Sequence, residues 1–163
     1  MTKLIKSGAY AQDSYAPVAD DAALPDGAVL VSLPRFQKER GALLERNTPI
    51  GVKLQAHENP EILGDDVSRL SLIALEFPKF RDGRAFSWAR VLRTRLGFTG
   101  EIRAVGDFLY DQVNYQRRVG FDAWEVPDHF TVEMFQRAVS EMTNVYQPST
   151  DSKKTIRELR ASR

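Results

Sequence analysis

Short apolar runs alternate with amphipathic stretches along most of the chain. Runs rich in Val, Ile and Leu are typical of buried strands, whereas apolar residues that recur every three or four positions are typical of helices. The apolar runs predict strands over residues 28–33, 50–55, 70–77, 101–106 and 122–126. The amphipathic stretches predict helices over residues 36–46, 60–69, 86–97, 108–119 and 132–145. Strand and helix therefore alternate, which indicates a parallel sheet with right-handed crossovers.

Turn and capping residues set the limits of several predicted elements. Ser7-Gly8 predicts the turn of a short hairpin over residues 4–15, and the Asp-, Ala- and Pro-rich stretch 17–27 predicts a loop. Asn59 before Pro60, and Asp107 after Gly106, have the residue types that cap helix N-termini. We expect one α/β domain over residues 1–147 and a polar C-terminal tail, frayed or loosely helical, over 148–163.

Charged residues near the ends of the predicted strands bear on how the sheet closes. Lys53, Glu76, Arg103 and Glu125 each stand among apolar neighbours on a different strand, with alternating sign. In an open, doubly wound, flavodoxin-like sheet they would be desolvated beneath helices, which is costly without partners. On the inner face of a sheet in sequential order they would form one row. The favoured fold is therefore a partial (β/α)-barrel of five parallel strands with an N-terminal hairpin, and the open sheet is the alternative.

The carboxyl ends of the parallel strands are where a ligand is expected. Residues on or after strands two to four are rich in cations that can hold an oxyanion, and the turn at Asp82-Gly83-Arg84 precedes a helix. The candidate anion- or ligand-binding residues are Lys53, Glu76, Arg81, Asp82, Arg84, Ser87, Arg103, Asp107, Asp111 and Gln112.

Each of these residues also has a plain structural interpretation. Arg84 fits a solvated loop residue, Ser87 a helix start and Asp107 a helix cap. Arg103, inside an apolar strand, needs a partner, and it fits a bridge between Glu76 and Glu125. The helix over 86–97 carries three further arginines that are expected on its solvated face, Arg90, Arg93 and Arg95.

Composition excludes several classes of function. The chain contains no cysteine, so it has no thiolate nucleophile, Cys-ligated cluster or disulfide, and His57 and His129 form no metal-binding pair motif. No glycine-rich dinucleotide or phosphate loop follows a strand, so no cofactor is readable, although a flavin is not excluded. The net charge of +1 argues against nucleic acid and anionic membranes as partners. The start of the chain has no long apolar run, so we expect a cytoplasmic protein.

Three segments carry a resemblance to a known family. They read EFPKF-DGR-S-AR-LR from Glu76 to Arg93, G-IRA-GD--DQ from Gly100 to Gln112, and R-GFDA from Arg118 to Ala123. They resemble the bacterial family catalogued as domain of unknown function 934, whose members are often labelled as oxidoreductases involved in sulfite reduction. Two positions depart from that pattern: Phe86 stands where tyrosine is common, and Val119 where cysteine is often found. We interpret both as packing positions.

The resemblance implies a role in assimilatory sulfur reduction, because genes of the family tend to lie beside those for sulfite reductase and for adenylyl-sulfate or phosphoadenylyl-sulfate reductase. The first hypothesis is an accessory or oxidoreductase component that acts with sulfite reductase or its electron donor. The lack of a cofactor motif favours the accessory form. The alternatives are a small-molecule enzyme or carrier that binds a sulfur oxyanion or phosphorylated nucleotide between Arg84 and Arg103, and a purely structural interaction protein. A homodimer would cover the open edges of a partial barrel.

Overall fold

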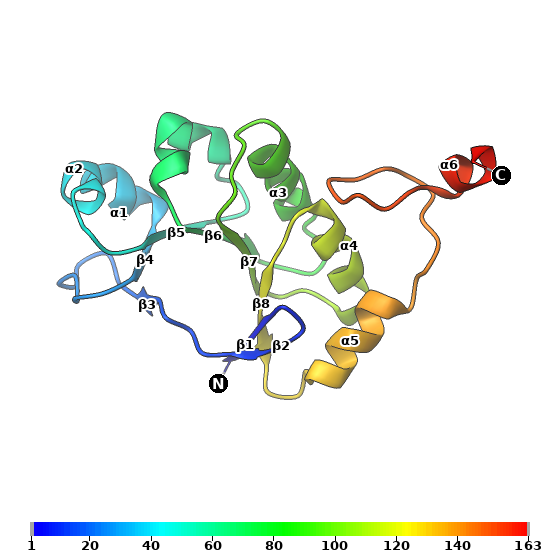
Figure 1. Ribbon diagram of the computed structural model, residues 1–163. Coiled ribbons are helices and arrows are strands. Elements are labelled where there is room, and N and C mark those ends of the chain that lie inside the picture. Colours follow the sequence, from blue (N-terminus) through cyan, green and yellow to red (C-terminus); the bar gives the residue numbers. More distant parts are fainter. Residues whose placement is uncertain (1, 163) are drawn as a thin grey trace.

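One curled, eight-stranded sheet organises the computed structural model, which describes residues 2–162 (Figure 1). The strand order is β2-β1-β8-β7-β6-β5-β4-β3. The strands are β1 (Thr2–Lys6), β2 (Ala9–Ala11), β3 (Ala16–Pro17), β4 (Val29–Ser32), β5 (Ile50–Leu54), β6 (Leu72–Phe77), β7 (Glu101–Gly106) and β8 (Ala123–Pro127). β3 to β8 are parallel and in sequential order, and β1 pairs antiparallel with β8. The predicted partial barrel is therefore confirmed.

Helices cover the outer face of the sheet, and its inner face is turned away from them (Figure 1). The α-helices are α1 (Leu33–Lys38), α2 (Arg40–Leu44), α3 (Arg84–Thr94), α4 (Val113–Val119), α5 (Val132–Ser140) and α6 (Ile156–Ala161), and the 3-10 helices are η1 (Pro60–Arg69) and η2 (Tyr110–Gln112). Alternate strand residues such as Val52, Ile73 and Ile102 join the main core beneath the helices. The residues between them, including Leu72 and Val105, form a small apolar cluster on the inner face.

Local sequence explains most element boundaries. Ser7 and Gly8 both have positive φ, 54° and 78°, as a tight hairpin turn requires. Asn59 caps η1 by accepting a hydrogen bond from the Glu61 N–H, although Gly64 (φ 51°, ψ −132°) interrupts that helix. Gly120, with φ 118°, ends α4. The predicted hairpin, the Asn59 cap and the stop at Gly120 are confirmed.

Several expected boundaries were wrong. Asp107 does not cap a helix: it follows β7 and its N–H donates to the Phe77 carbonyl, while η2 begins only at Tyr110. The first helix begins at Leu33, because the Ser32 hydroxyl accepts from the Arg35 N–H and acts as the cap. Residues 16–17, at the start of the expected loop, form the short edge strand β3, which pairs with β4.

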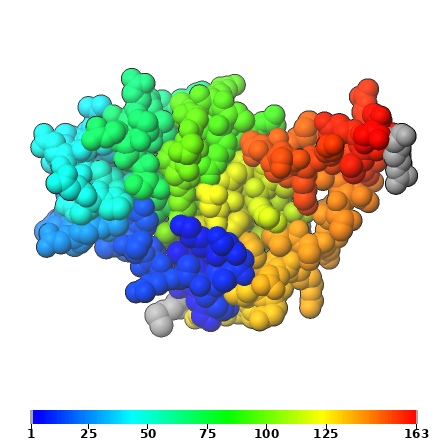
Figure 2. Space-filling model, viewed as in Figure 1, coloured from blue at the N-terminus to red at the C-terminus, as the bar shows by residue number. Residues whose placement is uncertain are grey.

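The C-terminal segment is anchored at its base and projects at its tip (Figures 1 and 2). Arg118 forms an ion pair with Asp151 (N···O 3.0 Å), and its carbonyl accepts hydrogen bonds from the hydroxyls of Ser149 and Thr150. Beyond this anchor, Thr155 and Glu158 form a capping box that begins α6. The tail therefore contacts α4 through Arg118 and contains one short helix.

Candidate functional site

The charged row predicted on the inner face exists. Lys53, Glu76, Arg103 and Glu125 occupy positions that alternate with the outer-face core residues on β5 to β8. Lys53 forms an ion pair with Glu76 (Nζ···Oε1 2.8 Å), and Arg103 with Glu125 (Nη1···Oε1 3.3 Å). Arg103 lies opposite Ala74 in the β6–β7 register, and Glu76 lies opposite Val105. Glu76 is thereby placed one inward-facing position beyond Arg103, and its ion pair is with Lys53.

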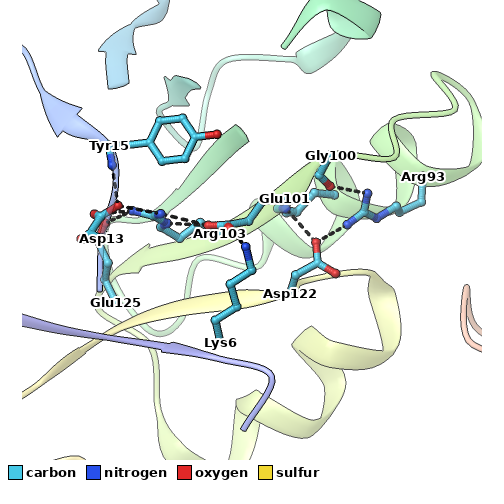
Figure 3. Close-up of polar contacts among 10 residues, drawn as sticks. Lys6, Asp13, Tyr15, Arg93, Gly100, Glu101, Arg103, Asp122 and Glu125 are labelled. Carbon is cyan, nitrogen blue, oxygen red and sulfur yellow. Dashed lines mark hydrogen bonds and ion pairs between the residues drawn. The ribbon is translucent and has the colours of Figure 1, made fainter. Parts of the chain in front are cut away.

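Arg103 is the most constrained member of the row, with its side chain only 1% exposed. Its guanidinium donates to Asp13 through two nitrogens (Nη1···Oδ2 2.7 Å, Nη2···Oδ1 3.1 Å) and to Glu101 (Nε···Oε1 2.9 Å), in addition to Glu125 (Figure 3). Burial lowers the pKa of Arg103, but its hydrogen bond to the Asp13 carboxylate and the negative charges of Glu101 and Asp13 outweigh this effect and raise the pKa. The guanidinium is therefore a permanent buried cation.

Two residues extend this cluster. Lys6 of the hairpin forms an ion pair with Glu101 (2.6 Å), and that hydrogen bond raises the pKa of Lys6. The Tyr15 ring lies over the Arg103 guanidinium, 5.8 Å from it, and burial raises the pKa of the Tyr15 hydroxyl. Two cations thus meet three carboxylates in one network that joins the N-terminal region to β7 and β8.

The remaining candidates lie in the loops and helices that follow β6 and β7. Arg84 forms a fork with Asp82 in its own turn, with Nε···Oδ1 at 2.9 Å and Nη2···Oδ2 at 2.5 Å. The hydrogen bonds from Arg84 lower the pKa of Asp82 to about 2. Gln112 accepts from the Leu109 N–H (2.9 Å) and donates to the Phe80 carbonyl (2.8 Å), so it ties two loops together. Arg81 lies over the Phe80 ring at 5.6 Å.

The structure divides the predicted site into two groups. Lys53, Glu76 and Arg103 lie on the inner face. Arg84 was expected to form one anion site with Arg103, but it pairs with Asp82 in the turn before α3, whereas Arg103 pairs with Asp13. Ser87, Asp107 and Asp111 are exposed on α3 and on the β7–α4 connection. The two departures from the family pattern lie in packed positions. Val119 is buried, and the Phe86 ring packs against the rings of Phe77 and Tyr115, with centroid distances of 5.2 and 5.3 Å.

Sequence reasoning missed Asp13, Tyr15 and Arg93. Arg93 is not on a solvated face: its guanidinium donates to the carbonyls of Phe98, Gly100 and Gly120, and pairs with Asp122. The only signal for Arg93 was its place in the family pattern. The signal for Asp13 was indirect. A buried arginine requires carboxylate partners, but the sequence around Arg103 does not identify which residues of the chain supply them.

A groove of about 1200 Å³ opens beside this network, between the hairpin and the base of the C-terminal segment (Figure 2). Trp124, Phe121 and Phe98 line it together with Arg93 and Arg117. Within residues 2–162, no group of three or more His, Asp or Glu side chains is placed to hold a metal ion. The same part of the chain contains no helix that is both long and apolar enough to cross a membrane.

The fold and the inner-face network define a class: an α/β protein whose parallel sheet curls into half a barrel around buried charge. The sequence matches the family described as "Bacterial protein of unknown function (DUF934)" over residues 51–157, well over half of the chain. The chain belongs to this family. Among curated proteins, none matches the sequence.

Proposed function

We propose that the protein is an accessory component of assimilatory sulfite and sulfate reduction in the cytoplasm and that it docks on sulfite reductase. The resemblance of the Glu76–Arg93 and Gly100–Gln112 segments to a family labelled in this way supplies the pathway. The observation that carries the accessory role is the internal pairing of three of the four expected oxyanion-binding cations. Lys53, Arg84 and Arg103 each bind carboxylates of the same chain. A substrate oxyanion would therefore have to displace an internal carboxylate to reach any of them.

An exposed apolar surface supports docking. Phe80, Leu109 and Tyr115 are 40%, 42% and 50% exposed, and we call them the aromatic edge. Gln112 connects the backbones of Phe80 and Leu109, the Tyr115 ring packs on Phe86, and all three exposed residues belong to the segments that follow β6 and β7. Exposed aromatic residues held on a rigid support are typical of protein interfaces.

A binding experiment with a matched control tests the proposal. The immobilised protein should retain purified sulfite reductase, and the Phe80→Ser/Leu109→Ser variant should bind at least tenfold more weakly. Ile62→Ser, which removes an apolar side chain that is 59% exposed on η1, should bind as the wild type does. Retention of neither sulfite reductase nor its electron donor would remove the proposed partnership.

Growth of a deletion strain gives an independent readout. Without the protein, cells should grow more slowly on sulfate or sulfite than on cysteine, because only the first two sources require sulfite reduction. Normal growth on sulfate, in a strain without a second copy of the gene, would contradict the proposed pathway. A flavin absorbance spectrum in the purified protein would instead favour the oxidoreductase role.

A further inference from the structure

The open side of the half-barrel is crossed by a short segment that we call the strap, residues 12–15 between β2 and β3 (Figure 1). Gln12, Asp13 and Ser14 are exposed, so most of the strap lies at the surface. Two of its side chains contact the sheet: the Asp13 carboxylate points toward Arg103, and the Tyr15 ring lies over the same guanidinium (Figure 3). The strap therefore touches the inner face chiefly through one carboxylate and one aromatic ring.

Asp13 binds Arg103 in the way that a ligand carboxylate would. Its two oxygens take separate guanidinium nitrogens, at 2.7 and 3.1 Å, which is the forked geometry by which arginine binds carboxylate, sulfate and phosphate groups. Arg103 is already paired with Glu101 and Glu125 from the sheet itself, at 2.9 and 3.3 Å. The buried cation thus keeps two carboxylates without Asp13. The Asp13 side chain is 36% exposed, so an anion from solvent can reach its position.

Tyr15 fills the apolar part of the same site. Its ring packs on the inner-face cluster of Leu30, Leu72, Ala74 and Val105 and lies over the Arg103 guanidinium at 5.8 Å. The side chains of Leu30 and Leu72 close over Gly51 between them, where an added Cβ would meet their carbons at 3.1 Å. An aromatic ring therefore has both an apolar floor and a cation within reach.

We propose that Asp13 and Tyr15 occupy, as an internal ligand, a binding site for a small aromatic anion, and that such a molecule binds by displacing the strap. The chemical class is a flat apolar ring that carries a carboxylate, sulfate or phosphate group. The anion takes the two Arg103 nitrogens that Asp13 occupies, and the ring takes the place of Tyr15. This site is separate from the aromatic edge and does not depend on the docking of sulfite reductase.

Removal of the internal ligand should strengthen binding. The apparent affinity of a site is its intrinsic affinity multiplied by the fraction of time for which the site is open. A strap that is closed for about 90% of the time therefore weakens binding about tenfold. Calorimetry with phenyl phosphate should therefore show at least tenfold tighter binding to Asp13→Ala than to the wild type. Asp151→Ala, which removes a carboxylate from the Arg118 ion pair instead, should bind as the wild type does. Equal affinity of Asp13→Ala and the wild type would overturn the proposal.

Two further measurements guard against a variant that fails to fold. In the wild type, saturating phenyl phosphate should increase hydrogen exchange at the amides of residues 12–15, an effect that binding elsewhere on the surface would not produce. Unchanged exchange at saturation would overturn strap displacement whatever the variants do. Inorganic phosphate should bind Asp13→Ala at least tenfold more weakly than phenyl phosphate. If the two bind equally, the site does not recognise the ring and the assigned ligand class is wrong.

Discussion

Arg93 on α3 donates two hydrogen bonds to the carbonyl oxygen of Gly120, at N···O distances of 3.1 and 2.8 Å. The same guanidinium also binds the carbonyls of Phe98 and Gly100, at 2.6 and 2.8 Å. One side chain thus joins the end of a helix to the loops that lead into β7 and β8. Those strands carry Arg103 and Glu125, so Arg93 holds the frame of the inner-face network without touching it.

Replacement of Arg93 by lysine should destabilise the protein although the charge is kept. Lysine cannot reproduce a planar fork that serves several carbonyls, and the loss of charge-assisted hydrogen bonds predicts about 2–4 kcal/mol of lost unfolding free energy. Urea denaturation measures this difference. Arg95→Lys is the matched control, because Arg95 is 70% exposed and pairs only at the surface with Glu61. Equal denaturation midpoints for the two variants would show that the Arg93 contacts contribute little.

Gly106→Ala should be poorly tolerated. Gly106 has φ +94°, and an added Cβ would lie 2.4 Å from the Phe77 carbonyl oxygen. Left-handed backbone strain and this overlap together predict a loss of about 3 kcal/mol or more. Gly97→Ala provides the comparison, since Gly97 has φ +62° but no heavy atom within 4 Å of the added carbon. Thermal unfolding should therefore separate the two variants, with Gly106→Ala the less stable.

Arg84→Ala should move the pKa of Asp82 from about 2 toward its ordinary value of 3.8. A carboxylate whose pKa is lowered in the folded state stabilises the protein. This stabilisation is fully present above the ordinary pKa and is lost as the pH falls through the lower pKa of the folded state. The wild-type turn should therefore keep its ion pair down to lower pH than the variant. Carboxyl chemical shifts in an NMR titration report this directly. Arg81→Ala should leave the Asp82 titration unchanged, because Arg81 lies over Phe80 instead.

Alkaline pH should loosen the strap. Burial raises the pKa of Tyr15 in the folded protein. The stability that the neutral Tyr15 side chain contributes is therefore fully present below the ordinary pKa of 10.0 and is lost as the pH rises through the higher pKa of the folded state. Hydrogen exchange of residues 12–15 should then increase in this range. Tyr15→Phe cannot ionise and should remove the Tyr15 part of the change, whereas Tyr10→Phe should not. The raised pKa of Lys6 predicts loss of its contact with Glu101 in the same direction, above 10.5.

The preference for a curled sheet over an open one and the charged inner row could be predicted because both follow from local rules. Side chains alternate across a strand, and a lysine or glutamate among apolar neighbours indicates a face that is not covered by helices. Lys53, Glu76 and Glu125 satisfied that reasoning without any knowledge of distant contacts. The hairpin turn at Ser7-Gly8 and the Asn59 cap were equally local.

The partners of Arg103 and Arg84 could not be assigned in the same way. Asp13 is 90 residues from Arg103 along the chain and reaches it only because the strap crosses the open side of the sheet. Arg84 was expected near Arg103, but Asp82 two residues away competes for the same guanidinium at lower entropic cost. Arg93 looked solvated because helical spacing does not reveal which loop carbonyls lie beyond the end of a helix.

The pairing of β1 with β8 has a consequence for how the molecule is made. Residues 2–6 are translated before their partner residues 123–127, and all the other strands of the sheet lie between them in the chain. The hairpin must therefore wait, and the sheet is completed only when β1 pairs with β8. Contacts so distant in sequence form slowly. Until this pairing forms, the facing backbone edges of β1 and β8 are bare, so the chain should be most prone to aggregation in that interval.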